Sequence, residues 1–207
     1  MGFYDAWVLP RLMNVAMGMR ALTHERKACL ASVSGTVLEL GFGAGHNLPC
    51  YPAAVSKVVG VDPSTQGAKL ARKRIAAAKF PVEHVALEGE RIDAPDAAFD
   101  AVVSTFTLCS VGDPPAALAQ LRRVLKPGGR FFFVEHGWAP EPKVQRWQNR
   151  LNGLQQAVFG GCHLNRDIER MVSDAGFAFD ELDKHYAQGA PRFAGFLTRG
   201  VARRAGV

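Results

Sequence analysis

The fold of this chain is decided by the stretch Thr36-Val37-Leu38-Glu39-Leu40-Gly41-Phe42-Gly43-Ala44-Gly45. Its first half, residues 36–40, is mostly apolar and typical of a buried strand. Glycine then stands at every second position, which allows a tight turn and a close approach of the backbone to a ligand. A dinucleotide-binding loop would need its third glycine at position 46, where this chain has His46. The stretch therefore predicts a loop that cradles a nucleoside-containing ligand without the dinucleotide spacing.

A second expected strand, residues 57–62, ends in the carboxylate of Asp62, one βα unit after the glycine loop. A carboxylate in this place accepts hydrogen bonds from both ribose hydroxyls in other nucleoside-binding α/β sites. The alternative is that Asp62 only caps the helix that follows Pro63. Because the glycine loop and the acid occur together and in the expected order, the ribose role is favoured.

Length and composition indicate one folded domain. The chain has 207 residues, of which 48% are hydrophobic and 21% charged, a composition that supports a full core and excludes a disordered chain. No apolar run approaches the ~20 residues that span a bilayer, and Asp5, Pro10 and Arg11 interrupt any signal-peptide core. We therefore expect a cytoplasmic protein with reduced thiols and no metal site. Its four cysteines lack the short spacings of metal-binding motifs, and they are Cys29, Cys50, Cys109 and Cys162.

The net charge of +6 is concentrated at the C-terminal end. Residues 184–207 hold five basic residues and no acidic one, so the rest of the chain is near +1. This distribution argues against nucleic-acid binding, which needs a basic patch or stripe across a folded face. The basic end leaves open a weak peripheral contact with an anionic membrane surface.

Strands and helices alternate along the chain, which predicts a mostly parallel sheet with helices on both faces. Residues 1–34 are assigned to an N-terminal amphipathic helical cover and residues 35–207 to one globular domain. The Lys-Pro-Gly-Gly segment 126–129 predicts a turn, and the short link 187–191 predicts an antiparallel hairpin at the end. The expected strands are 36–41, 57–62, 82–87, 100–105, 130–136, 179–186 and 192–199, and the expected helices are 46–51, 65–79, 114–125, 144–159 and 166–175.

Several segments together resemble the class I S-adenosylmethionine-dependent methyltransferases, within the methyltransferase type 11 domain. They are residues 39–45 with the glycine loop, Val61-Asp62-Pro63-Ser64, residues 99–104, and residues 121–129 ending in Lys-Pro-Gly-Gly. The resemblance implies an α/β, Rossmann-like sheet of seven strands with an antiparallel last strand. It also implies S-adenosylmethionine as the cofactor and S-adenosylhomocysteine as the product.

A narrower resemblance lies outside these segments. Residues 107–111 (Thr-Leu-Cys-Ser-Val), Glu135-His136, residues 160–166 and residues 190–195 are similar to the animal methyltransferase-like alkyl thiol methyltransferases and their bacterial relatives. Those animal proteins carry an apolar N-terminal membrane anchor, whereas this chain begins with a shorter amphipathic segment. The resemblance implies a small, largely apolar acceptor and includes a thiol among the candidates.

The resemblance implies a cofactor role for a defined set of residues. The glycines approach the methionyl and ribose portions, Glu39 helps to hold the ammonium group through water, and Asp62 takes the ribose hydroxyls. Residues 89–91 edge the adenine ring, and residues 104–106 lie near the methyl group. The full set is Glu39, Gly41, Phe42, Gly43, Gly45, Asp62, Pro63, Ser64, Gly89, Glu90, Arg91, Ser104, Thr105 and Phe106.

The acceptor side is predicted from residues at the ends of strands and on helices. A thiol reacts as its thiolate, so a base near the methyl group would assist. His136 ends an expected strand at the edge where ligands bind in such sheets, and it is the best candidate for this base, with Thr105 beside it. A purely structural role for His136 stays open, as it does for Cys162 and His163. The expected acceptor-binding residues are Phe3, Tyr4, Trp7, Cys109, His136, Trp147 and His163.

Other functions are weighed against this one. The Asn/Asp-Pro-Pro-aromatic motif of enzymes that methylate nucleic-acid bases is absent after residue 103, where the chain reads Ser104-Thr105-Phe106-Thr107. His46 in place of the third glycine disfavours a nicotinamide-dependent oxidoreductase. A phospholipid (phosphatidylethanolamine) N-methyltransferase and a non-catalytic S-adenosylmethionine-binding protein both remain as alternatives. The oligomeric state is left open.

Overall fold

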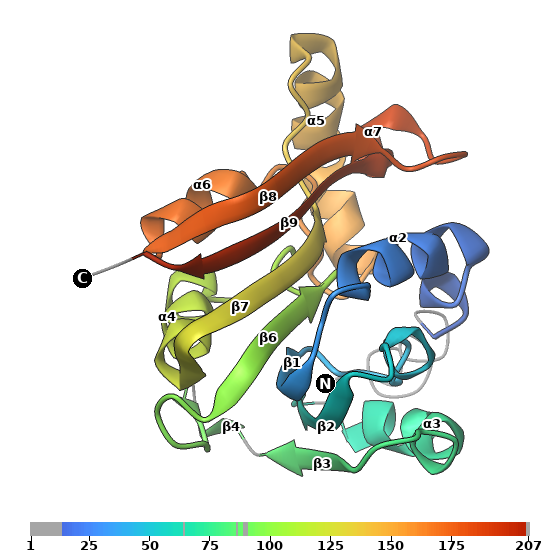
Figure 1. Ribbon diagram of the computed structural model, residues 1–207. Coiled ribbons are helices and arrows are strands. Elements are labelled where there is room, and N and C mark those ends of the chain that lie inside the picture. Colours follow the sequence, from blue (N-terminus) through green and yellow to red (C-terminus); the bar gives the residue numbers. More distant parts are fainter. Residues whose placement is uncertain (1–13, 64, 86, 89–90, 206–207) are drawn as a thin grey trace.

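The computed structural model contains a seven-stranded sheet in the order β3-β2-β1-β6-β7-β9-β8 (Figure 1). It describes residues 14–63, 65–85, 87–88 and 91–205. Strand β9 runs antiparallel to both neighbours, and the remaining pairs are parallel. The predicted α/β fold with an antiparallel last strand is therefore confirmed. The strands of this sheet are β1 (Gly35–Leu40), β2 (Val55–Val61), β3 (Val82–Val85), β6 (Phe99–Thr105), β7 (Leu125–His136), β8 (Phe177–Tyr186) and β9 (Phe196–Arg204).

Helices cover both faces of the sheet because the side chains of each strand alternate between two apolar cores. On β7, Phe131 and Phe133 enter the core that also contains residues of α4 and α6. Phe132 and Val134 enter the other core, with residues of α2 and α3. Full burial of one such side chain contributes about 1.5–3 kcal/mol. The helices are α2 (Arg20–Leu30), η2 (Leu48–Cys50, a 3₁₀ turn), α3 (Thr65–Ala76), α4 (Pro114–Val124), α5 (Pro142–Val158), α6 (Ile168–Asp174) and α7 (Arg192–Gly195).

The C-terminal antiparallel hairpin is confirmed, but the expected strand 192–199 is wrong in its first half. Residues Arg192–Gly195 form the short helix α7, and β9 begins only at Phe196. Pro191 has no N–H to donate to a ladder, and its carbonyl accepts the Ala194 N–H at 2.9 Å, which closes a helical turn.

The expected turn at 126–129 is instead part of β7, which begins at Leu125 directly after α4. Leu125 pairs with Phe99, and the register shifts before Ala101 pairs with Arg130. The additional residues of β7 are accommodated in this irregularity, where Gly128 has a φ of +78°.

Two other expected elements differ in extent. The expected strand 82–87 ends at Val85, and a separate two-stranded sheet follows, made of β4 (Leu87–Glu88) and β5 (Arg91–Ile92). The expected helix 46–51 is reduced to the 3₁₀ turn η2, because the chain returns to an extended conformation at Tyr51.

The carboxyl ends of β1, β2, β6 and β7 meet at one edge of the sheet (Figure 1). The glycine loop follows β1, Asp62 follows β2, Phe106 follows β6, and His136 ends β7. This edge is where ligands bind in open α/β sheets. Among the described residues, no helix has the length and apolar character needed to span a membrane.

Candidate active site

The glycine loop turns through backbone conformations that other residues rarely adopt. The φ angle is +73° at Gly41 and +51° at Gly43. A Cβ atom at Gly41 would lie 2.0 Å from Oγ1 of Thr107, so both conformation and space require glycine at this position. The Gly45 N–H donates to the Phe42 carbonyl at 2.9 Å and closes the turn.

Asp62 lies across the cleft from this loop and is tied to it. Its Oδ2 accepts the Gly43 N–H at 2.7 Å. The hydrogen bond joins the ends of β1 and β2 and holds the carboxylate at the mouth of the loop. Asp62 and its neighbour Pro63 both line a cavity, and the ribose contact of Asp62 stays a prediction.

Two adjoining cavities open along the sheet edge. One has a volume of about 370 Å³ and is bordered by Glu39, His46 and Asn47 among others. The second, of about 620 Å³, is bordered mainly by apolar side chains. The two form one cleft because they share five lining residues, Gly41, Asp62, Phe106, Thr107 and Gly160. The apolar part suits a flat purine ring, and the polar part suits an amino-acid group.

Glu39 is buried in the polar part of the cleft and is held by two side chains. Tyr51 donates its hydroxyl to Oε2 at 2.7 Å, and Asn47 donates Nδ2 to Oε1 at 3.0 Å. Asn47 also donates to Oγ1 of Thr105 at 3.1 Å. Burial raises the pKa of Glu39 to about 7, although the two hydrogen bonds and the charge of Arg26 oppose that rise. The carboxylate is thus oriented toward a site where a cationic group would stabilise its charge.

Arg26 of α2 brings a second charge to this part of the cleft, and sequence reasoning assigned it no site role. Its Nη1 donates to the Met17 carbonyl at 2.7 Å, and its guanidinium lies 5.1 Å from the ring centroid of Phe106. Burial lowers its pKa. Arg26 Nε and Nε2 of His46 are both buried without a hydrogen-bond partner in the part of the chain that the structure describes. Burial, and then the charges of Arg74 and Arg26, lower the pKa of His46 to about 4, so this imidazole is neutral.

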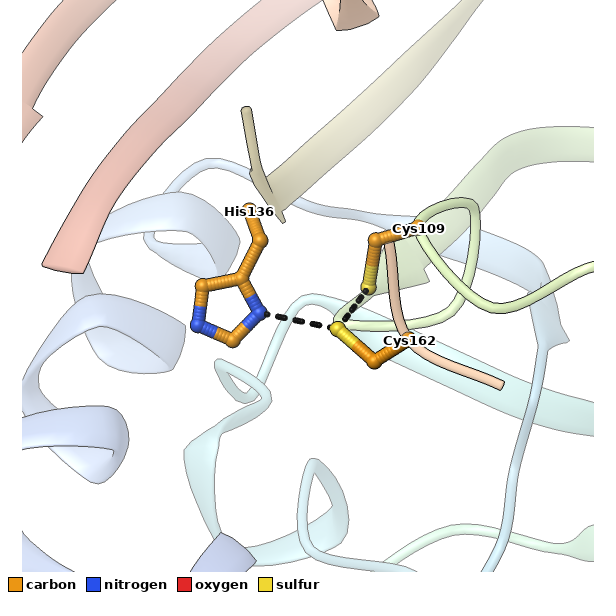
Figure 2. A group of neighbouring side chains, drawn as sticks. All are labelled: Cys109, His136 and Cys162. Atoms are coloured by element: carbon orange, nitrogen blue, oxygen red, sulfur yellow. Dashed lines mark hydrogen bonds between the residues drawn. The ribbon is translucent and has the colours of Figure 1, made fainter. Parts of the chain in front are cut away.

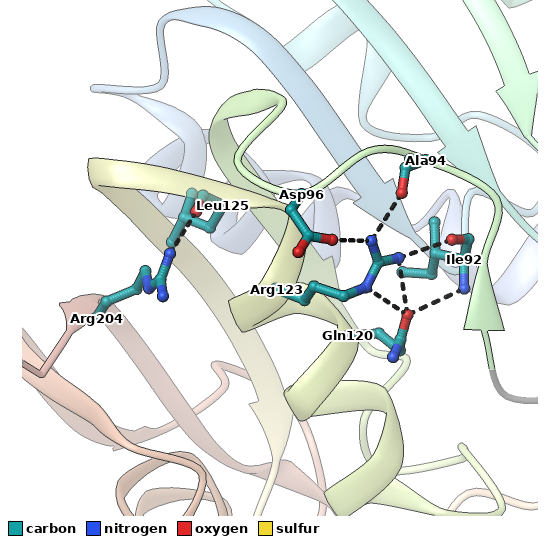
Figure 3. A network of polar contacts seen from close by, with 7 residues as sticks. All are labelled: Ile92, Ala94, Asp96, Gln120, Arg123, Leu125 and Arg204. Atoms are coloured by element: carbon teal, nitrogen blue, oxygen red, sulfur yellow. Dashed lines mark hydrogen bonds and ion pairs between the residues drawn. The ribbon is translucent and has the colours of Figure 1, made fainter. Parts of the chain in front are cut away.

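A network around Arg123 of α4 fixes the wall of the larger cavity (Figure 3). The guanidinium donates to the carbonyls of Ile92 and Ala94, each at 2.8 Å, and to Asp96 at 2.6 Å. It also donates to Oε1 of Gln120, which in turn accepts the Ile92 N–H at 3.3 Å. Ile92 and Gln120 both line the cavity. Ile92 and Gln120 therefore form part of the wall of this cavity, whereas the sequence predicted residues 89–91 for the adenine contact.

Three residues from distant parts of the chain meet at the end of β7, in the "sulfur cluster" of Cys109, His136 and Cys162 (Figure 2). The sulfur of Cys162 lies 3.4 Å from the sulfur of Cys109 and 3.4 Å from Nδ1 of His136. Both cysteines are buried. The sequence predicted acceptor-binding roles for Cys109 and His136, but the contact with Cys162 was not foreseen.

The contacts within the sulfur cluster shift the pKa values of its three residues. The hydrogen bond with Cys109 and then that with His136 lower the pKa of Cys162 to about 4, against the effect of burial. Burial alone would lower the pKa of His136, but the hydrogen bond and charge of Cys162, together with the charge of Glu135, raise it. The pKa of Cys109 is raised by its hydrogen bond with Cys162 and by burial. These contacts therefore favour the ionised form of Cys162 over that of Cys109.

Glu135 holds the loop after β6 in place from beneath. Its buried carboxylate accepts the Ser104 hydroxyl at 2.7 Å, the Thr107 N–H at 3.1 Å and the Cys109 N–H at 3.2 Å. Ser104 is fully buried in this contact, whereas its neighbours Thr105 and Phe106 line the cleft. Of the three residues that the sequence predicts near the methyl group, Thr105 and Phe106 therefore line the cleft, and Ser104 contacts the residue that supports it.

The remaining predicted site residues lie in three places. Trp147 on α5 is 56% exposed, and Arg91 on β5 is exposed too. His163 is half-buried beside the sulfur cluster, where its N–H donates to the Cys109 carbonyl at 2.8 Å and its Nδ1 lies 3.5 Å from Nδ2 of Asn152. Their roles stay predictions. Six others lie outside the described residues, namely Phe3, Tyr4, Trp7, Ser64, Gly89 and Glu90.

Comparison with known sequences identifies relatives among methyltransferases. Residues 38–133 match the family described as "Methyltransferase domain". The chain is 36% identical over 152 residues to thiol S-methyltransferase TMT1B of Rattus norvegicus, an alignment that covers 72% of this chain and 62% of the rat protein. It is 31% identical over 142 residues to phosphatidylethanolamine N-methyltransferase of Cereibacter sphaeroides, covering 68% of each. The chain thus spans less than two thirds of the length of the rat relative.

Solved structures share the fold. A putative methyltransferase of Bacillus halodurans superposes with a TM-score of 0.72 at 18% identity, covering 89% of this chain and 99% of the other. Geranyl diphosphate methyltransferase in complex with S-adenosylmethionine gives a TM-score of 0.68 at 17% identity, covering 89% and 85%. These identities are low, so the superpositions establish the sheet and its helices alone.

Proposed function

Because the chain belongs to the methyltransferase-domain family, we propose that it transfers the methyl group of S-adenosylmethionine to a small, largely apolar thiol. The observation that carries the proposal is the two-part cleft at the carboxyl ends of β1, β2 and β6, joined at Gly41, Asp62 and Phe106. Its larger part accommodates an adenine, and its polar part accommodates a methionyl group. The junction lies beside Thr105 and Phe106, where a methyl group would face the acceptor.

The residues of the cleft match the groups of the cofactor. The Asp62 carboxylate suits the two ribose hydroxyls, because it accepts hydrogen bonds and is fixed by Gly43. Glu39 suits the ammonium group. Arg26 suits the carboxylate, since its buried guanidinium retains an Nε donor without a partner among the described residues. The bound cofactor would supply a methyl group on a sulfonium, and the protein orients it and excludes water.

The thiol acceptor is supported by the relatives and by the chemistry next to the junction. Thiol S-methyltransferases are among the relatives at 36% identity. The sulfur cluster lies behind Phe106, whose ring centroid is 5.6 Å from that of His136. An acceptor thiol loses its proton to become nucleophilic. In this proposal His136, behind Phe106, helps to stabilise the resulting thiolate.

A phospholipid acceptor is the second candidate, because the Cereibacter relative bears the name phosphatidylethanolamine N-methyltransferase. It would use the basic C-terminal residues to meet an anionic surface. In the structure four of these five charges have acidic partners: Lys184 pairs with Glu169, Arg192 with Glu141, Arg199 with Glu25 and Asp183, and Arg203 with Asp180. Local pairing weakens attraction to a membrane surface and favours the small thiol.

The test is an acceptor screen that measures release of S-adenosylhomocysteine. The full chain is supplied with S-adenosylmethionine and, in separate arms, short alkyl thiols, phenols, primary amines or phosphatidylethanolamine vesicles. We expect turnover with alkyl thiols and none with the vesicles. Turnover only with the vesicles would favour the phospholipid function, and cofactor binding without turnover in any arm would favour a non-catalytic binding protein.

A further inference from the structure

The sulfur cluster has the donor atoms and spacing of a metal site. Cys109 comes from the loop after β6, His136 from the end of β7, and Cys162 from the segment after α5 (Figure 2). The two sulfur atoms and one ring nitrogen all lie within 4.8 Å of one another. Two of these separations, sulfur to sulfur and sulfur to Nδ1, are 3.4 Å each.

These separations are close to those around a tetrahedral zinc ion. Zinc–sulfur bonds of about 2.3 Å and zinc–nitrogen bonds of about 2.0–2.1 Å place neighbouring donor atoms roughly 3.6–3.8 Å apart. The observed separations of 3.4 Å and at most 4.8 Å bracket this range. Thiolate and imidazole donors together select zinc over magnesium or calcium.

We propose that Cys109, His136 and Cys162 bind a zinc ion, and that the acceptor thiol completes its coordination. The metal site follows from the cluster alone, whereas the identity of the fourth ligand rests on the proposed function. The thiolates of Cys109 and Cys162 neutralise the two charges of the ion, so the site with its three protein ligands adds no net charge to the interior. A neutral buried site costs less than an isolated buried thiolate.

The three ligands are already held by their surroundings. The Cys109 N–H donates to Glu135 at 3.2 Å, and the Cys109 carbonyl accepts the His163 N–H at 2.8 Å. The Cys162 N–H donates to the Phe159 carbonyl at 3.2 Å, and His136 pairs with Leu197 of β9. Outer contacts of this kind orient metal ligands before the ion binds. The ligand atoms therefore need little rearrangement to close around the metal.

The cluster lies directly behind residues that line the cleft, and the fourth ligand would reach it past them. The His136 ring packs against Phe106, which lines both cavities. The sulfur of Cys109 lies 3.6 Å from Oγ of Ser110, which lines the larger cavity. Gly160 lines both cavities, and Cys162 follows two residues later. Three protein ligands with one open position are typical of catalytic zinc sites.

The chemical step balances with the cofactor as the methyl donor. The acceptor thiol releases its proton to solvent when it coordinates zinc, because the ion stabilises the thiolate. A lone pair on that sulfur forms the new bond to the methyl carbon. The bond from this carbon to the sulfonium breaks, and its electron pair stays on the cofactor sulfur. The products are a neutral thioether, which is a weaker zinc ligand, and S-adenosylhomocysteine.

Metal content tests the site directly. We expect inductively coupled plasma mass spectrometry of the purified full chain to find close to one zinc per chain. Replacing zinc with cobalt(II) is expected to produce the charge-transfer absorption of cobalt–thiolate bonds. Protein that takes up neither zinc nor cobalt(II), with Cys109 and Cys162 joined in a disulfide by mass spectrometry, would overturn the proposal.

Single substitutions distinguish the proposed metal ligands from a cysteine outside the sulfur cluster. Cys109→Ser, Cys162→Ser and His136→Asn are expected to lose the metal, whereas Cys50→Ser, a half-buried cysteine outside the cluster, keeps it. Calorimetry with S-adenosylmethionine shows that each variant is folded. Equal zinc content in the Cys162→Ser and Cys50→Ser proteins would contradict the site.

Coordination of the acceptor thiol to the metal is tested by a separate measurement. Adding an alkyl thiol to the cobalt(II) protein is expected to shift the charge-transfer band, and an unchanged spectrum would refute acceptor coordination. Metal-free protein that still methylates thiols would refute acceptor coordination to zinc and leave the proposed function intact. Protein that binds zinc but methylates no thiol would refute the proposed function and leave the metal site intact.

Discussion

The two ends of the cleft are built in opposite ways. At the glycine-loop end, backbone groups and oxygen atoms dominate: Asp62 accepts a loop N–H at 2.7 Å, and Glu39 accepts from Tyr51 and Asn47. At the other end, two sulfur atoms and an imidazole meet behind Phe106. The first arrangement suits the binding of a polar, charged cofactor. The second supplies groups that react with or hold a sulfur atom, so recognition and reactivity are assigned to different ends.

The largest expected effect comes from the sulfur end. His136→Ala should lower kcat with an alkyl thiol by about 10²–10⁴-fold, the range for loss of a group that handles a proton or an activated nucleophile. The dissociation constant of S-adenosylmethionine should change little, because His136 does not line the glycine-loop end. Steady-state kinetics and calorimetry on the same protein measure both. If cofactor affinity fell in parallel with kcat, the assignment of recognition and reactivity to different ends of the cleft would be wrong.

The reverse pattern is expected for Asp62. Asp62→Ala should weaken S-adenosylmethionine binding about 100-fold, since two hydrogen bonds to a charged acceptor contribute about 3 kcal/mol or more. Asp100→Ala is the matched control, because Asp100 accepts the Thr36 N–H at 2.8 Å and an ion pair from Lys126 away from the cleft. Calorimetric titration compares the two. An equal effect of both substitutions would show that Asp62 acts only through folding.

A comparison of two glycines tests whether the glycine loop excludes a side chain through crowding as well as through its backbone conformation. Gly41 and Gly128 have similar φ angles, +73° and +78°. A Cβ at Gly41 would meet Thr107, but one at Gly128 would meet nothing within 4 Å. Gly41→Ala should cost about 2–5 kcal/mol of unfolding free energy and Gly128→Ala about 1–2 kcal/mol, because only the first adds overpacking to backbone strain. Urea unfolding measures both, and equal costs would argue against the crowded loop.

The smallest expected effect is a pH dependence that comes from Glu39. Its pKa is raised by burial to about 7, so the ionised form that suits the ammonium group develops only as pH rises through that value. Affinity for S-adenosylmethionine should increase about tenfold per pH unit below 7 and level off above it. The same shift predicts that stability from protonated Glu39, fully present below about pH 4.5, is lost as pH rises through 7. Glu39→Gln should flatten both profiles, and unchanged slopes in this variant would remove Glu39 as their source.

The glycine-loop end could be predicted because its signals are local in sequence. An apolar run followed by alternating glycines, and an acid one βα unit later, specify the loop and Asp62 within 27 residues (36–62). The alternation of elements likewise predicted the sheet. The first half of the expected strand 192–199 failed because Pro191 starts a helical turn there, an effect that apolar composition does not reveal.

At the sulfur end the sequence predicted roles for Cys109 and His136, but the contact of both with Cys162 could not be predicted, because the three residues are 26 to 53 positions apart. Only the topology brings the loop after β6, the end of β7 and the segment after α5 together. Arg26 was missed for a similar reason: on a helix with charged and apolar residues, an arginine is usually solvated, and here the cleft buries it. Glu135 directly follows the apolar residues 131–134 of β7, and the sequence did not indicate that it supports the loop after β6.

The most direct test of the account is a crystal structure of the full chain with S-adenosylhomocysteine. We predict that the adenine lies in the larger cavity beside Ile92 and Gln120, that Asp62 contacts the ribose, and that the sulfur atom of the ligand faces Phe106 and the sulfur cluster. Adenosine bound anywhere other than between the β1 and β2 crossovers, or a ligand sulfur turned away from Phe106, would contradict it.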